Sequence, residues 1–248
     1  MADAARTHRP AHPSRPPRPR AVVFDLWNTL IEADEFSPLK GNTRLLEAAG
    51  SDAPLDALLA YEAGILRDTE RREDESHIEY TRQSLQRLLN DRFGIRSPLS
   101  LAEQEWEYWS SSMSARLVEG VPDMLDGLAR RSIRRAVISN SSFTADTIGR
   151  TLADLGVADR FEFVVSSADY GVRKPHTAIF EAALARLGLA PNEAWFAGDI
   201  VEYDLKGGLG AGMFTVLFRP PVDEPPDFNG YRRIERWSEL AGLLDEAD

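Results

Sequence analysis

The feature that most constrains the fold is a repeated pattern of short apolar runs that alternate with amphipathic helical segments. The runs are rich in Val, Ile and Phe, and they occur as AVVFDL (21–26), RRAVISN (134–140), RFEFVVSS (160–167), EAWFAGD (193–199) and GMFTVLF (212–218). Short runs that are apolar on both faces are typical of strands buried in a parallel sheet. Helical segments between successive strands predict βαβ units. We therefore predict an α/β fold with a doubly wound parallel sheet.

Residues 32 to 118 interrupt this alternation, and we find no convincing strand in them. At least three amphipathic helices are predicted there, and three of them can be located. The first lies around residues 55–66. The second opens with the capping sequence Ser76–Glu79, and the third opens with Ser100–Glu103 and runs through Leu117. These helices predict a small bundle inserted between the first and second strands, and its core is expected to contain Trp106, Trp109 and Met113.

The charge and composition exclude several classes of function. A formal net charge of -11 argues against a nucleic-acid backbone as the partner, because that role needs a basic face. Cysteine is absent, which excludes disulfides and cysteine-ligated zinc. No apolar run approaches the roughly 20 residues that span a bilayer. We expect a cytoplasmic protein, either a monomer or a homodimer, with no membrane partner.

The first 19 residues differ from the rest of the chain. They are rich in Pro, Arg and Ala, and Met1 is their only large apolar residue. Such a segment has little surface to bury, so we predict that residues 1–19 are a disordered tail.

Polar residues follow three of the predicted strands. Asp25 ends the first strand, Ser139 and Asn140 end the second, and Asp199 ends the fourth. Because the carboxyl ends of parallel strands meet at one edge of the sheet, we expect a ligand site there. Asp204 lies five residues after Asp199, and Lys174, one of only three lysines, precedes Pro175, which we place in the first turn of a helix. The set predicts a site for phosphate chemistry.

Four of these segments resemble a known family. FDLWNTL, VISN, GVRKP and GDIVEYD, in this order, are similar to the four motifs of the haloacid dehalogenase superfamily, and KGGLGAGMFTV resembles the segment that follows the fourth motif in its phosphatases. The resemblance covers residues 20 to about 218. It implies a Rossmann-like catalytic core formed by residues 20–31 and 119–248, and a helical cap formed by residues 32–118.

The resemblance also implies roles for single residues. Asp25 would be the nucleophile that forms an aspartyl-phosphate intermediate. Ser139 and Asn140 would contact the phosphoryl group, and Lys174 would neutralise its charge. Mg²⁺ would be bound by Asp25, Asp199, Asp204 and the backbone carbonyl of Trp27. The implied protein is a Mg²⁺-dependent hydrolase that acts on a small phosphorylated metabolite.

Trp27 departs from the pattern of the family. The phosphatases that the sequence resembles carry a second aspartate at this position, which acts as general acid and then as general base. Indole cannot move a proton, and losing such a group typically costs about 10²–10⁴ in rate. The substrate would then need a good leaving group, or the aspartyl phosphate would be long-lived, or a cap residue would supply the proton: Glu35, His77 or Glu79.

Two further alternatives follow from Trp27. True 2-haloacid dehalogenases carry an aromatic residue at this position and need neither acid nor metal, so dehalogenation is one alternative. A catalytically silent binding or regulatory protein is the other. The pair Asp199 and Asp204 favours a metal enzyme, because two carboxylates beside a nucleophilic Asp would weaken it unless a cation neutralised them. A phosphonoacetaldehyde-hydrolase-like reaction would need a cap lysine, and Lys40 lies too near the first motif.

Overall fold

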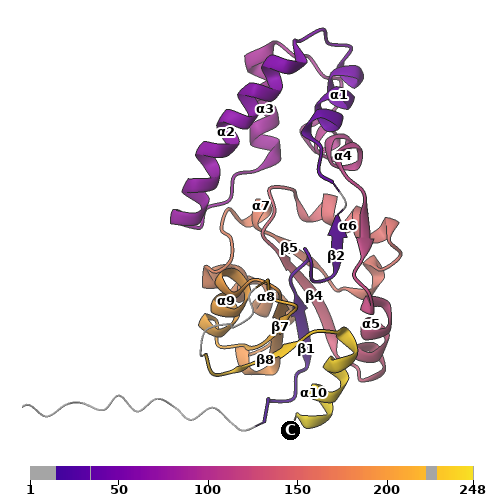
Figure 1. Ribbon diagram of the computed structural model, residues 1–248, viewed down its shortest axis with the longest axis vertical. Helices are drawn as coiled ribbons and strands as arrows, with labels where there is room; N and C mark the ends of the chain where they lie inside the picture. Colours follow the sequence, from indigo (N-terminus) through magenta and orange to yellow (C-terminus); the bar gives the residue numbers. More distant parts are fainter. Residues whose placement is uncertain (1–14, 34, 222–227, 248) are drawn as a thin grey trace, which may run out of the picture.

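The computed structural model describes residues 15–33, 35–221 and 228–247, with residues 70–74 described by their backbone only. The molecule is elongated, with a sheet flanked by helices at one end and a group of four helices at the other (Figure 1). The boundary between the two ends is here called the waist (Figure 1).

The sheet has six parallel strands in the order β5-β4-β1-β6-β7-β8. Their bounds are β1 Ala21–Phe24, β4 Arg134–Ser139, β5 Val164–Ser166, β6 Ala194–Gly198, β7 Phe214–Phe218 and β8 Tyr231–Ile234. After β1 the chain adds β4 and β5 on one side of that strand, and then β6, β7 and β8 on the other side. The predicted doubly wound α/β sheet is therefore confirmed. Strand β8 was not predicted, because YRRI carries two arginines on an edge strand that is only partly buried.

Helices cover both faces of the sheet, and the alternation of side chains along β1 shows why. Val22 and Phe24 point to one face, where they pack against α5 (Val121–Arg130), α6 (Ala145–Asp154) and α10 (Leu240–Glu246). Ala21 and Val23 point to the other face. That face is covered by α8 (Thr177–Leu187) and lies near the short helices α7 (Ser167–Tyr170) and α9 (Lys206–Gly210). Strand β1 is therefore completely buried, because helices pack against the apolar side chains on both of its faces.

The helical group consists of α1 (Pro38–Ala49), α2 (Leu55–Ser76), α3 (Arg82–Phe93) and α4 (Leu101–Ser112). Helix α1 was not among the predicted helices. The predicted start at Ser76 was wrong, because Ser76 ends α2 and Thr81 caps α3 by accepting a hydrogen bond from Ser84 N–H at 3.1 Å. His77 has a positive φ of 56°, which ends the helical geometry at that point. The predicted capping box of Ser100 and Glu103 at the start of α4 is present.

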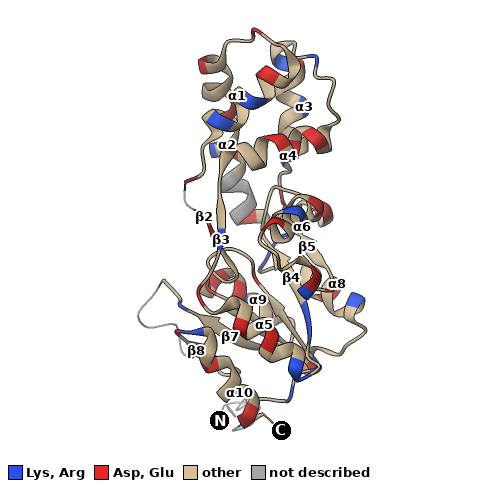
Figure 2. Ribbon diagram, turned by 90° about the vertical axis from the view of Figure 1, so that its right-hand side faces the viewer, with Lys and Arg blue, Asp and Glu red and all other residues tan. Residues whose placement is uncertain are grey.

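Two short strands connect the helical group to the sheet. Strand β2 (Ile31–Ala33) lies beside β3 (Ala115–Leu117) in Figure 2. The two strands pair antiparallel, with Ile31 opposite Leu117. The prediction of no strand in residues 32–118 was therefore wrong, and the third helix ends at Ser112 rather than at Leu117. A three-residue strand has too few positions to show a period, and its partner lies far away in the sequence.

The described part of the N-terminal segment contacts the sheet domain. Pro16 and Pro19 are buried, and the carbonyl of Pro17 accepts a hydrogen bond of 2.8 Å from Trp195 Nε1. The prediction of disorder was therefore wrong for residues 15–19, because a buried indole N–H needs an acceptor. Residues 1–14 lie outside the described residues. Across the part of the chain that is described, no helix combines the length and apolar character that crossing a membrane requires.

Remaining turns are short. They are the 3₁₀ turns η1 (Ala158–Arg160), η2 (Pro191–Glu193) and η4 (Trp237–Glu239), and the π-helical turn η3 (Val201–Leu205). Turn η3 follows β6 directly and carries Asp204.

Candidate active site

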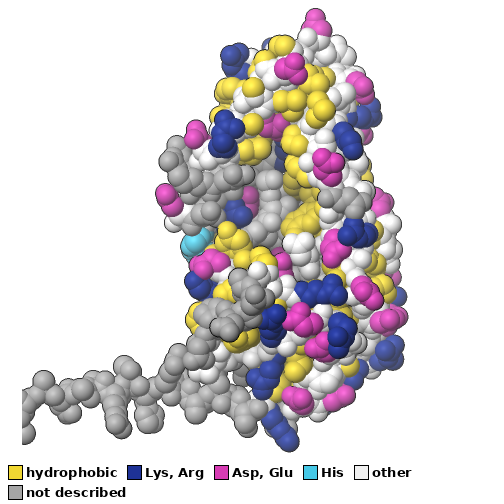
Figure 3. Space-filling view, viewed as in Figure 1, with side chains coloured by type: hydrophobic (Ala, Val, Ile, Leu, Met, Phe, Trp, Pro, Cys, Tyr) yellow, Lys and Arg dark blue, Asp and Glu magenta, His cyan; other side chains and the backbone are white. Residues whose placement is uncertain are grey.

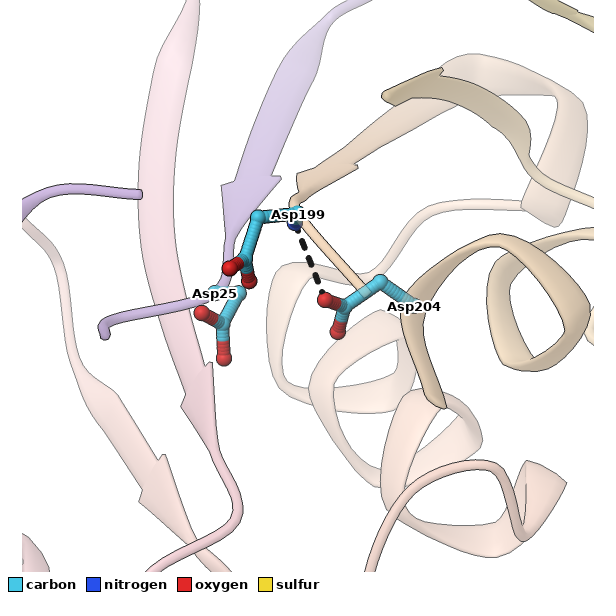
Figure 4. Close-up of side chains that lie close together, drawn as sticks. All are labelled: Asp25, Asp199 and Asp204. Atoms are coloured by element: carbon cyan, nitrogen blue, oxygen red, sulfur yellow. Dashed lines mark hydrogen bonds between the residues drawn. The ribbon is translucent and has the colours of Figure 1, made fainter. Parts of the chain in front are cut away.

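Three buried aspartates meet at the carboxyl ends of neighbouring strands. Asp25 follows β1, Asp199 follows β6, and Asp204 lies in η3, as the close-up in Figure 4 shows. Each offers a carboxylate oxygen, and these oxygens lie within 4.8 Å of one another. Strands β1 and β6 are adjacent at the point where the order of strand addition reverses, which is where ligands bind in open parallel sheets. The structure thus brings Asp25 of one motif together with Asp199 and Asp204 of another.

Asp204 is held in place by the turn that precedes it. Its Oδ2 accepts hydrogen bonds from the backbone N–H of Asp199 at 3.0 Å and of Ile200 at 2.9 Å. Gly198 makes this approach possible, since a Cβ at that position would lie 2.6 Å from Asp204 Oδ2. The glycine of the GDIVEYD segment is therefore required by close packing, which sequence inspection did not reveal.

Lys174 neutralises part of this negative charge. Its side chain is 2% exposed, and its Nζ donates hydrogen bonds to Asp25 Oδ1 and, at 2.6 Å, to Asp204 Oδ1. Pro175 follows in a cis peptide bond and precedes the helix, because α8 begins at Thr177 with His176 as its N-cap. Pro175 was expected in the first helical turn, and that expectation was wrong.

Asn140 contacts the backbone of Lys174. Its Oδ1 accepts from Lys174 N–H at 2.7 Å, and its Nδ2 donates to the Lys174 carbonyl at 2.9 Å. This pair of hydrogen bonds ties the end of β4 to the loop that carries the lysine. Asn140 was expected beside the phosphoryl group, whereas in the structure both ends of its amide are used to position Lys174. A fixed backbone places the lysine ammonium between its two carboxylate partners.

Ser139 is the last residue of β4, and its side chain is fully buried. Among the described residues, Ser139 Oγ has no hydrogen-bond partner. Buried hydroxyls are nearly always hydrogen-bonded, and one that is not has a role that requires explanation. A hydroxyl of this kind is available to donate to an oxygen of a bound ligand.

The electrostatics of the cluster call for more positive charge than Lys174 supplies. Burial raises the pKa of Asp25 to about 6, with Asp204 adding to the rise and Lys174 opposing it. Burial, followed by the nearby charges of Asp25 and Asp204, raises the pKa of Asp199 to about 7. The pKa of Lys174 is also raised, because the two carboxylates it contacts outweigh the effect of its burial. Three carboxylates face one ammonium, and a hard cation that prefers oxygen ligands fits this excess of negative charge.

Trp27 lies two residues after Asp25, and its half-buried ring faces the helical group. The ring packs against Trp109 of α4, with ring centroids 5.6 Å apart. The rings of Trp109 and Phe143 are also in contact, with centroids 4.5 Å apart, and Trp109 Nε1 donates a hydrogen bond of 2.7 Å to Thr151 Oγ1. Trp109 therefore joins the helical group to the sheet domain. The expectation that it belongs to the core of the bundle was wrong, and the partly buried Trp106 and Met113 pack against the same interfacial cluster.

The helical group also contacts the loops that hold Lys174 and Asn140. Ile78 pairs with Val172 in an antiparallel bridge, and Arg173 N–H donates to the His77 carbonyl at 3.0 Å. Arg82 N–H donates to the carbonyl of Ser142 at 2.7 Å. These contacts join residues far apart in the sequence, and no motif in the sequence signals them.

The three cap residues considered as proton donors occupy different positions. Glu79 is buried, accepts from Ser167 Oγ at 2.6 Å and lines a cavity of about 310 Å³ that Asn140 also lines. Glu35 is exposed and His77 is half-buried. Neither of the last two lines that cavity. Glu79 is thus the one of the three that shares a cavity with a residue of the candidate site.

Comparison with known proteins agrees with this geometry. The chain matches the haloacid dehalogenase-like hydrolase family over residues 19–212. It belongs to that family, and it is a hydrolase. The chain is 31% identical over 210 residues to the ribulose-1,5-bisphosphate 5-phosphatase of Halopiger xanaduensis, a match that covers 81% of this chain and 84% of the relative. It is 29% identical over 206 residues to the glyceraldehyde 3-phosphate phosphatase of Methanothermobacter thermautotrophicus, a match that covers 83% of this chain and 88% of the relative.

The fold is shared with enzymes of more than one activity. A crystal structure of a 2-haloacid dehalogenase from Pseudomonas syringae pv. Tomato superposes with a TM-score of 0.67 at 22% identity, and the match covers 92% of this chain and 98% of that one. At this level of identity the likeness shows the fold alone. The choice between reactions therefore depends on the residues of the site.

Proposed function

We propose that this haloacid dehalogenase-like hydrolase is a Mg²⁺-dependent phosphohydrolase that acts on a small phosphorylated metabolite through an aspartyl-phosphate intermediate on Asp25. The observation that carries the proposal is the meeting of Asp25 with Asp199 and Asp204 of a distant segment, beside a buried lysine that contacts Asp25 and Asp204. Two relatives that match most of the chain are named as phosphatases of small phosphorylated sugars, which supports the same class of reaction.

The donor set suits Mg²⁺. Asp25, Asp199 and Asp204 would hold the ion together with the backbone carbonyl of Trp27, and waters would complete its shell. The bound ion would neutralise charge on the nucleophile and on the phosphoryl oxygens. Neutralisation is needed here, because the raised pKa values of Asp25 and Asp199 show how strongly the cluster disfavours its own ionised state.

The residues of the chain divide the remaining work. Asp25 attacks phosphorus through a carboxylate oxygen, and the bond to the leaving oxygen breaks as the new bond forms. Ser139 Oγ donates to a phosphoryl oxygen, which gives its unpartnered hydroxyl a ligand. Lys174 stabilises the negative charge, and Asn140 keeps the lysine in position. Water then hydrolyses the aspartyl phosphate and regenerates Asp25.

The helical group has the role of a cap in this proposal. Residues 32–118 would close over a catalytic core made of residues 20–31 and 119–248 and would exclude water from the site. Support comes from the contacts of residues 77–82 with the loops that carry Lys174 and Ser142.

A second candidate is hydrolytic dehalogenation, and Trp27 is the observation that favours it. An aromatic residue in place of a general acid suits the departure of halide, which needs no proton. The retained pair Asp199 and Asp204 opposes it, because two carboxylates beside the nucleophile lower its reactivity without a cation. A silent binding protein is opposed by the complete set of Asp25, Ser139 and Lys174 around that pair.

Acetyl phosphate tests the proposal directly, because its leaving group needs no protonation. We expect hydrolysis that requires Mg²⁺ and is lost in Asp25→Asn, whereas Asp91→Asn, an exposed change on α3, should keep full activity. Acid quenching during turnover should trap phosphate on the wild-type protein and not on Asp25→Asn. Absence of turnover with and without Mg²⁺ would refute the proposal, and halide release from 2-chloropropionate in EDTA would establish the alternative.

A further inference from the structure

An aromatic cavity opens beside the candidate site at the waist of the molecule. Its volume is about 380 Å³, which falls within the roughly 300–1,000 Å³ of small-molecule sites. Figure 3 shows apolar side chains gathered at this waist, between the helical group and the sheet. The cavity, here called the aromatic pocket, is lined by Trp27, Ala33, Phe36, Trp109, Met113, and the segment 140–143.

Trp109 and Phe143 form the buried walls of the aromatic pocket. Trp109 is fixed by its hydrogen bond to Thr151, and Phe143 is buried with its N–H donating to Ser141 Oγ at 3.1 Å. Phe36 differs from these, because 46% of its surface is exposed although its ring lies 6.4 Å from that of Phe143. A planar apolar ligand would cover Phe36 and would add an edge-to-face contact of the kind that Phe143 makes with Trp109 and with Phe36.

Trp27 and Asn140 connect the aromatic pocket to the candidate site. Trp27 lies two residues from the nucleophile, and Asn140, which lines the pocket, is hydrogen-bonded to the backbone of Lys174. We place the leaving group of a phosphoryl group at Asp25 beside Trp27, the position where the phosphatases that the sequence resembles carry a general acid. None of the side chains of Trp27, Phe36, Trp109 and Phe143 can protonate a leaving oxygen.

A second cavity at the waist offers less to a charged substrate. It holds Arg82 and Arg173, but the guanidinium of Arg82 is paired with Glu62, and Arg173 lies 3.8 Å from the carboxylate of Glu79. Each cation is balanced by a carboxylate, so this cavity has no excess of positive charge for a second phosphate. The chemistry of the waist favours an apolar group over a bisphosphate.

On the basis of the proposed function, we infer that the aromatic pocket binds the leaving group, and that the substrates are phosphate monoesters of planar, phenol-like alcohols. A phenol has a pKa of about 10, well below that of an alkyl alcohol, so a phenolate departs without a proton whereas an alkoxide does not. In the step, the bond from Asp25 to phosphorus forms, and the bond from phosphorus to the aryl oxygen breaks. The electron pair leaves on the phenolate, which takes its proton from water outside the site.

Binding and kinetics test this inference on the full-length protein in Mg²⁺. Phenylphosphonate, which cannot be hydrolysed, should bind at least about tenfold more tightly than methylphosphonate, because aryl contacts with the pocket are made by the former alone. In Phe36→Ala, the KM for phenyl phosphate divided by that for acetyl phosphate should rise about threefold to tenfold. Leu88→Ala, a similarly exposed apolar change on α3 outside the pocket, should leave that ratio unaltered.

The outcomes separate this inference from the proposed function. In the first case, the protein turns over acetyl phosphate and yet binds the two phosphonates equally, or shows the same KM ratio in Phe36→Ala as in the wild type. Either result would overturn the role of the aromatic pocket and leave the proposed phosphohydrolase function intact. Failure to turn over either substrate would overturn both. An aryl preference that Phe36→Ala reduces would support the inference.

Discussion

Lys174→Met removes the ammonium group that lies between Asp25 and Asp204 and keeps a side chain of similar length. In the wild-type protein both contacts are buried, and the lysine side chain is 2% exposed. Taking one partner out of a buried ion pair costs about 3–5 kcal/mol, because the remaining charge has no compensation. We expect Lys174→Met to lose about this much unfolding free energy at pH 8 without Mg²⁺.

The loss should depend on pH, and its direction follows from the raised pKa values. The pKa of Asp25 is about 6 and that of Asp199 about 7 in the folded protein, against 3.8 for an ordinary aspartate. An acid of this kind gives its full contribution to stability below pH 3.8 and loses it as the pH rises through the folded pKa. At pH 5 both groups are mostly protonated, so the missing ammonium matters less there. We expect about half of the loss seen at pH 8.

Urea unfolding of the wild-type protein and of Lys174→Met, at pH 5 and pH 8, measures this effect. Added Mg²⁺ should restore part of the stability of the variant at pH 8, because a divalent ion can replace the missing positive charge. Lys206→Met, which removes a surface lysine paired with Glu202, is the control and should change stability by less than about 1 kcal/mol. An equal loss at pH 5 and pH 8 would refute the electrostatic account of the cluster.

Three further predictions concern other parts of the structure. Glu62→Ala should lower the free energy of unfolding in urea by about 3–5 kcal/mol, because it leaves the buried Arg82 guanidinium without its carboxylate. Glu47→Ala, an exposed change, should lower it little, and a small loss for both variants would contradict the buried ion pair. Gly198→Ala should weaken Mg²⁺ binding in calorimetry by at least about tenfold, since the new methyl would displace Asp204, and unchanged affinity would count against Asp204 as a ligand. The rise in Tm on adding Mg²⁺ to the wild-type protein should be larger at pH 8 than at pH 5, because protons compete for Asp25 and Asp199, and a pH-independent rise would place the ion elsewhere.

The core of the fold could be predicted from the sequence because its signals are local. Each of the predicted strands is a short apolar run, and three of the runs end in polar residues that the chain places at the same edge of the sheet. Asp25, Asp199 and Asp204 could therefore be assigned to one site before their distances were known. The order of the motifs was enough to indicate the family, which the match over residues 19–212 confirms.

Tertiary structure alone decided the features that depend on residues far apart in the sequence. Strand β2 pairs with β3 across the whole helical group, Trp109 lies at an interface rather than in a bundle core, and Asn140 holds the backbone of Lys174. The sequence determined which side chains are apolar and which carry charge, because those properties belong to single residues and their neighbours. Which buried groups share hydrogen bonds or meet across a waist is set by the packing of the whole chain, since the energies of these contacts depend on partners brought together only by folding.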